Sequence, residues 1–151
     1  MQTEFKLTRF SREVLARFFE NHTLEQLNKI PAGFNNNLIW NIGHVVVSQQ
    51  LLVYKGSGVE ALISDELIAR YARGSKPEHD VTQAEADEIK TLMFSLIDKT
   101  EEDYNNGLFT TYHARMSEMG FSLQTTQDAI VFNNHHEGIH LGIMLQLKKF
   151  I

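Results

Sequence analysis

Apolar residues recur at helical spacing along most of this chain, and few residues interrupt the pattern. Only two prolines and nine glycines occur in 151 residues. Proline breaks helices, and the alternation typical of strands is sparse, so the pattern favours long helices. We expect an all-α protein in which four long helices form a bundle, with short extra helices in the connections. The length fits a single domain, residues 1–151.

Capping residues indicate where these helices begin. Thr23 and Thr82 each open a capping box, and a run of three asparagines, residues 35–37, offers N-caps for the second long helix. We predict an apolar stripe of Phe10, Val14, Phe18 and Phe19 on the first helix. Residues 108–124 fit a short strand, a turn or a lid. The expected long helices cover residues 5–20, 37–55, 82–104 and 125 to the C-terminus.

Composition excludes several classes of function. The net charge is −5, which disfavours binding to nucleic acid. No cysteine is present, so disulfides, thiolate metal ligands and a cysteine nucleophile are ruled out. The N-terminus lacks the apolar core of a signal peptide, and the most apolar stretch, residues 38–54, is too polar to span a membrane. We therefore expect a cytoplasmic protein without a membrane partner.

The last helix carries a pattern that is typical of metal sites. His136 and His140 are four residues apart and share one helix face, so both imidazoles can reach one ion. With Glu137 between them they form the string H-E-x-x-H of zinc peptidases. Such peptidases take a third ligand downstream, but none of the eleven residues after His140 is His, Asp or Glu. The third ligand must therefore come from earlier in the chain.

His44 is the best candidate for that ligand. On a helical wheel it shares a sector of about 60° with Asn37, Asn41 and Ser48, bordered by apolar residues. Asn133 extends a matching polar sector on the last helix. Buried polar groups are costly unless they have partners, and a metal site would supply them. We therefore predict metal ligands His44, His136 and His140, beside a pocket formed by Asn37, Asn41, Ser48 and Asn133.

Other residues near this pattern have simpler interpretations. Glu137 is rotated about 100° from the histidines, so it is either a base beside the metal or, as we favour, a surface residue. His135 is expected at the surface or behind the ligands, and Trp40 in the pocket wall or the core. Gly138 and Gly142 lie opposite the histidines, which suggests a contact with another helix or a second subunit.

At these residues the chain resembles the DinB-like (YfiT-like) family of helical-bundle metalloproteins. Residues 36–44, NNLIWNIGH, are similar to that family's N-x-x-W-x-x-G-H segment, and residues 136–142, HEGIHLG, to its H-E-x-x-H-x-G segment. The resemblance covers essentially the whole chain. It implies an up-down-down-up bundle, zinc or nickel held by His44, His136 and His140, and a homodimer.

The resemblance also suggests chemistry. Relatives of known function use low-molecular-weight thiols in transfer or isomerisation, and others are described as metal-dependent hydrolases. Three imidazoles and an open coordination position suit catalysis. We therefore expect a metal-dependent enzyme that transfers a small thiol to an electrophilic small molecule. The alternatives are a metal-dependent hydrolase, with Glu137 or a cosubstrate group as base, and a bundle that binds metal or a small ligand without catalysis.

Overall fold

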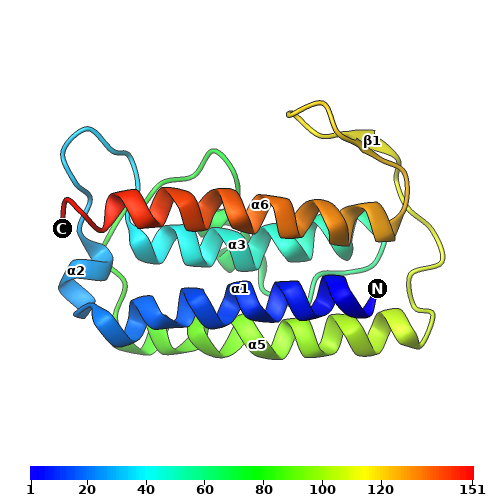
Figure 1. Ribbon diagram of the computed structural model, residues 1–151, viewed down its shortest axis with the longest axis horizontal. Coiled ribbons are helices and arrows are strands. Elements are labelled where there is room, and N and C mark those ends of the chain that lie inside the picture. Colours follow the sequence, from blue (N-terminus) through cyan, green and yellow to red (C-terminus); the bar gives the residue numbers. More distant parts are fainter.

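The computed structural model describes residues 1–151 and contains six α-helices. Figure 1 shows α1 and α6 running in one direction and α3 and α5 in the other. The predicted all-α bundle is confirmed, and the order of its helices is up-down-down-up. The four long helices are α1 (Gln2–Asn21), α3 (Leu38–Val53), α5 (Gln83–Asn105) and α6 (Thr126–Leu147).

Short elements occupy the connections, and their caps follow the sequence. Helix α2 (Leu24–Asn28) and helix α4 (Asp65–Tyr71) begin after Thr23 and Ser64, whose hydroxyls accept backbone N–H bonds. Capping boxes also open α5 and α6. A 3-10 turn, η1 (Lys55–Ser57), follows α3, and the strands β1 (Arg115–Met116) and β2 (Ser122–Leu123) pair antiparallel.

Helix α3 lies at the centre of the fold and is buried over nearly its whole length. It packs against α4, α5 and α6, so its polar residues face protein rather than water. Of the three candidate caps, Asn37 is the one used: its Oδ1 accepts the Trp40 N–H at 2.9 Å. No helix combines the length and the apolar character needed to cross a lipid bilayer.

The predicted stripe on α1 is wrong in one respect. Phe10 is 56% exposed, whereas the buried face includes Phe5, Thr8, Arg12 and Leu15. Hydrophobic periodicity predicts that a charged residue faces solvent. Arg12 is instead fully buried, and the inward face of α1 is the one that carries it. Arg12 is buried because it has a partner on α6, and the periodicity of α1 cannot identify that partner.

That partner is Glu137, which is also fully buried, so our preferred interpretation of it as a surface residue is wrong. Arg12 Nε donates to Glu137 Oε2 at 2.9 Å, and Arg12 Nη2 donates to Glu137 Oε1 at 2.7 Å. The guanidinium also approaches the backbone carbonyls of Met93 on α5 and Val45 on α3, each at 3.4 Å. One ion pair therefore contacts all four long helices and fixes the rotation of α6 in the bundle.

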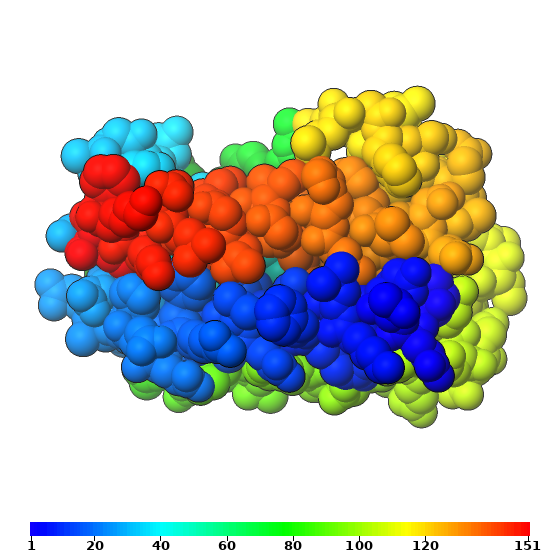
Figure 2. Space-filling model, in the orientation of Figure 1, coloured from blue at the N-terminus to red at the C-terminus, as the bar shows by residue number.

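The hairpin of β1 and β2 resolves the alternatives left open for residues 108–124. Figure 2 shows it projecting at one end of α6, with the loop before α3 projecting at the other. The Phe121 ring stacks on Phe132 of α6, with centroids 5.7 Å apart, and Arg73 after α4 forms an ion pair with Glu118 in the hairpin turn. The hairpin is therefore attached both to α6 and to the segment that follows α4.

The buried ion pair predicts an asymmetric mutational response. Arg12→Met alone should lower the free energy of unfolding by about 3–5 kcal/mol, because it leaves the Glu137 carboxylate buried without its partner. Arg12→Met combined with Glu137→Leu should recover most of that loss. Urea denaturation measures both values. Equal destabilisation in the single and double variants would contradict the role given to the pair.

Candidate metal centre

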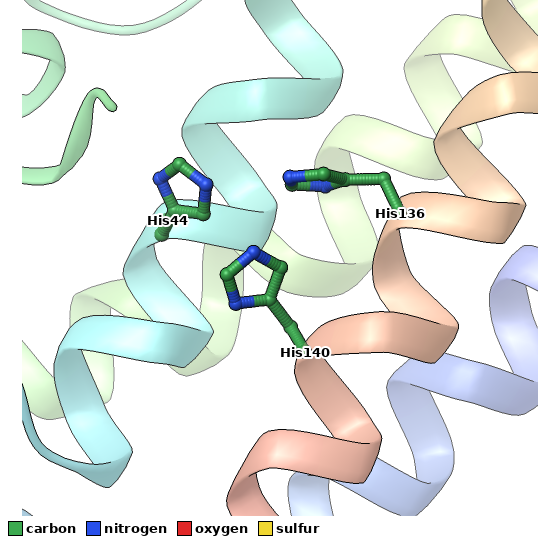
Figure 3. Close-up of side chains that lie close together, drawn as sticks. All are labelled: His44, His136 and His140. Atoms are coloured by element: carbon green, nitrogen blue, oxygen red, sulfur yellow. The ribbon is translucent and has the colours of Figure 1, made fainter. Parts of the chain in front are cut away.

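The three predicted histidines come together between α3 and α6. Figure 3 shows His44 projecting from α3 toward His136 and His140, which project from α6. The ring centroids lie 5.1 Å (His44 to His136), 4.6 Å (His44 to His140) and 4.6 Å (His136 to His140) apart. One nitrogen from each ring lies within 4.8 Å of those from the other two. The i, i+4 spacing on α6 accounts for this geometry, since both rings leave the same face.

These separations fit a divalent metal ion. Zinc–imidazole bonds of about 2.0–2.1 Å place tetrahedral ligand nitrogens about 3.3 Å apart. Small rotations of the three side chains would bring the nitrogens to that distance. The three residues are His44, His136 and His140, and none of them is more than partly exposed. No carboxylate belongs to the group, so the donor set consists of imidazoles alone.

Hydrogen bonds at Nδ1 fix the ring orientation of two of the three histidines, His44 and His140. His44 Nδ1 lies 2.7 Å from the Tyr71 carbonyl oxygen, which can only accept, so Nδ1 carries the proton and Nε2 is left with its lone pair. His140 Nδ1 lies 2.9 Å from Asn41 Oδ1. The Asn41 amide group donates to Asn36 and to the Asn37 carbonyl, so its oxygen faces His140 and accepts the Nδ1 proton. Both histidines therefore offer Nε2 to a metal.

His136 differs from the other two. Its outer ring nitrogen points toward His44 (Figure 3). Its Nδ1 is buried and has no hydrogen-bond partner. His136 Nδ1 therefore lacks the hydrogen bond that Nδ1 makes in His44 and His140.

Burial keeps the three imidazoles neutral. Burial, together with the neighbouring histidines, lowers the pKa of His136 to about 4 and that of His140 to about 3. Burial also lowers the pKa of His44, against the opposing hydrogen bond to Tyr71. Neutral imidazole is the form that binds metal. The site is therefore ready to bind a cation at neutral pH without first releasing protons.

A close backbone contact positions His44. A Cβ atom added at Gly43 would lie 2.6 Å from Cε1 of the Tyr71 ring, so glycine lets α4 approach α3. The approach brings the Tyr71 carbonyl to the His44 ring. The Trp40 ring stacks on a face of the His44 ring, with centroids 4.8 Å apart and an angle of 9° between the planes. Trp40 is thus a buried wall of the site, as its place in the sequence predicted.

The predicted pocket residues have different surroundings. Asn41 contacts His140, and Ser48 Oγ lies 3.3 Å from His44 Nε2. Asn37 caps α3 and donates to the Asn28 carbonyl, so its amide is already used in the fold. Asn133 is buried and donates to Glu137 Oε1 at 2.8 Å. The structure thus brings Asn41 and Ser48 to the histidines and gives Asn37 a role in capping.

A separate cavity of about 360 Å³ lies behind Trp40 and Tyr71. It borders α4 and the loop before α5, and none of the three histidines lines it. Asn37 is among its lining residues, together with Arg70 and Lys76. Trp40 and Tyr71 therefore form a wall shared by this cavity and the metal centre.

The remaining histidines and glycines lie outside the centre. His22 is half-buried and His79 and His113 are exposed, as is His135, which agrees with one of the two positions expected for it. Gly138 and Gly142 are also exposed, and no other part of the chain comes within 4 Å of a Cβ atom built on either. They make no helix contact within this chain. A contact with a second subunit stays a prediction.

The comparison with known families agrees with this geometry. The sequence profile of the DinB superfamily matches residues 7–144, which include α3, most of α6 and all three histidines. The chain belongs to the DinB superfamily.

The fold of this DinB protein is also found in a solved structure. The crystal structure of a conserved protein from Enterococcus faecalis aligns over 99% of this chain and 95% of its own, with a TM-score of 0.61 and 14% sequence identity. At that identity the likeness shows the fold alone. No curated protein matches the sequence.

Sequence reasoning missed two residues that shape this DinB site. Tyr71 acts through a backbone carbonyl, which leaves no signature in the sequence. Arg12 could have been found, because Phe5, Thr8 and Leu15 share its helix face and would bury it. A lone charge on an apolar face indicates a buried partner.

The lowered pKa values predict how the metal-free protein responds to acid. The unfolded chain takes up protons near the ordinary histidine pKa of 6.5, whereas folded His136 does so at about 4. The unfolded state therefore binds more protons between these values, and the free energy of unfolding should fall as the pH drops from about 6.5 toward 4. Urea denaturation across that range measures the slope. His136→Leu should flatten it, whereas His79→Ala should not, and equal slopes in all three proteins would contradict the assignment.

Proposed function

We propose that this protein is a metal-dependent enzyme that transfers a low-molecular-weight thiol to an electrophilic small molecule. The observation that carries the proposal is the cluster of His44, His136 and His140, whose nitrogens converge without a carboxylate. Three imidazoles leave an open position on a tetrahedral ion, which is the arrangement of catalytic rather than structural sites. Zinc and nickel both suit this donor set.

The chain's own residues would hold and orient the reactants. Asn41 and the Tyr71 carbonyl keep two rings turned so that Nε2 faces the centre. The Ser48 hydroxyl lies beside His44 Nε2, where it can turn to bond a group that enters the open position. Trp40 and the surrounding apolar core limit the access of water, which strengthens electrostatic interactions in the site.

A bound divalent metal would supply the acidity that the thiol lacks, by lowering the pKa of a coordinated S–H group. In the transfer, a carbon–sulfur bond forms as the leaving group departs with its electron pair, and the thiol proton passes to water. No general base is required for such a step once the thiol is ionised. The chain contains no cysteine, so the thiol must come from a cosubstrate.

The position of Glu137 favours thiol transfer over hydrolysis. Hydrolysis through water at the same centre would use a carboxylate as base, and Glu137 is the acidic residue adjacent to the ligands. Both of its oxygens are bound by Arg12, and one also accepts from Asn133. A carboxylate held in this way is poorly placed to accept a proton from water. We therefore assign Glu137 a positioning role, in place of the catalytic one considered from the sequence.

Conversion of monobromobimane by zinc- or nickel-loaded protein tests this function. With a small thiol present, the rate should exceed the protein-free background, and it should fall at least about tenfold after chelation or in His140→Ala. His79→Ala, with an exposed histidine, should retain the activity. Thiol-independent cleavage of p-nitrophenyl acetate that requires the metal would support the hydrolase instead. Metal binding without either activity would favour a non-catalytic binding protein.

A further inference from the structure

We propose that Asn133 is the hydrogen-bond partner that orients His136, across one bridging water molecule, when the metal is bound. The inference rests on the metal site proposed above and assigns a residue that completes it. It starts from two buried atoms, His136 Nδ1 and Asn133 Oδ1, which both lack a hydrogen-bond partner. A buried polar atom without a partner costs about 1–3 kcal/mol, so two on one helix turn indicate a shared partner.

The orientation of the Asn133 amide is set by its neighbour. Glu137 is paired with Arg12, and a carboxylate can only accept, so Asn133 must present its NH2 group to Glu137 Oε1. The distance between these atoms is 2.8 Å. Asn133 Oδ1 is therefore the atom left over, and it can only accept. Arg12 thus determines, through Glu137, which atom of Asn133 remains for another donor.

His136 Nδ1 requires a hydrogen-bond acceptor when the metal is bound. Its outer nitrogen points to His44, so metal binding through that nitrogen places the ring proton on Nδ1 (Figure 3). Histidine ligands almost always donate this proton to a carboxylate, a carbonyl or a water molecule. His44 and His140 already do so, to Tyr71 and Asn41. His136 is the ligand whose Nδ1 lacks a partner.

The helix places the two unpaired atoms on one face. Asn133 and His136 are three residues apart on α6, a spacing that makes side chains neighbours. The atoms do not bond directly, but a water molecule can accept from His136 Nδ1 and donate to Asn133 Oδ1. Buried waters occupy sites of this kind, where two or more polar groups lack other partners. The result is a chain of contacts from Arg12 through Glu137 and Asn133 to a metal ligand.

Zinc binding to wild-type protein and Asn133→Leu tests the assignment. We expect zinc affinity to fall about 10- to 100-fold, the range found when a partner behind a metal ligand is lost. Long-range 15N–1H spectra of the zinc-loaded proteins provide the second readout. Faster exchange of the His136 ring N–H in the variant, with the His44 and His140 signals unchanged, is the expected result.

Asn134→Leu is the matched control. Asn134 is the next residue on α6, and its amide bonds to Thr8 and to the Glu4 carbonyl on α1, away from the histidines. This variant should keep wild-type zinc affinity and the His136 signal. If Asn133→Leu does not fold, as judged by circular dichroism, Asn133→Ala removes the same oxygen without adding bulk.

Two results would overturn the inference while leaving the metal site intact. One is unchanged zinc affinity with an unchanged His136 N–H signal in the folded Asn133 variant. The other is a loss of affinity with that signal unchanged, which would show that Asn133 acts only through packing. Wild-type protein that binds no zinc would instead remove the proposed function, and this inference with it.

Discussion

The buried ion pair between Arg12 and Glu137 joins all four long helices at one point. Its two charges come from α1 and α6, and the guanidinium also reaches carbonyls of α3 and α5. Apolar packing alone allows helices to rotate by small amounts, because side chains of similar size can replace one another at the contact. A bidentate pair has directional bonds, and it contributes specificity where its net stabilisation is small. The direction in which α6 presents its histidines therefore depends on this pair.

The cluster of three histidines lies on the side of α6 next to that contact. Glu137 turns toward α1, while His136 and His140, on either side of it in the sequence, turn toward α3. The string H-E-x-x-H thus has two parts in this chain: its acid has a structural role, and its histidines belong to the cluster that could hold a metal ion. This division explains how an apparent peptidase motif can occur without the third downstream ligand that peptidases require.

Much of the fold could be predicted from sequence because helices leave local signatures. Thr23, Thr82 and Thr125 cap helices as their spacing to a glutamine or an acidic residue indicates. The three histidines could also be predicted, because i, i+4 spacing and a polar stripe on an apolar helix depend on local geometry alone. The pairing of Arg12 with Glu137 could not, because the two residues lie on different helices, 125 positions apart in the chain. The same limit applies to Tyr71, whose contribution is a backbone atom.

Elemental analysis of protein purified without a histidine tag tests whether His44, His136 and His140 hold one divalent ion. We expect about one equivalent of zinc or nickel per chain, lost in His44→Ala, His136→Ala and His140→Ala and kept in His79→Ala. Absence of metal from the wild-type protein, even after divalent ions are added back, would show that the three histidines hold no ion. The cluster would then be a set of neutral histidines that serve only to pack α3 against α6.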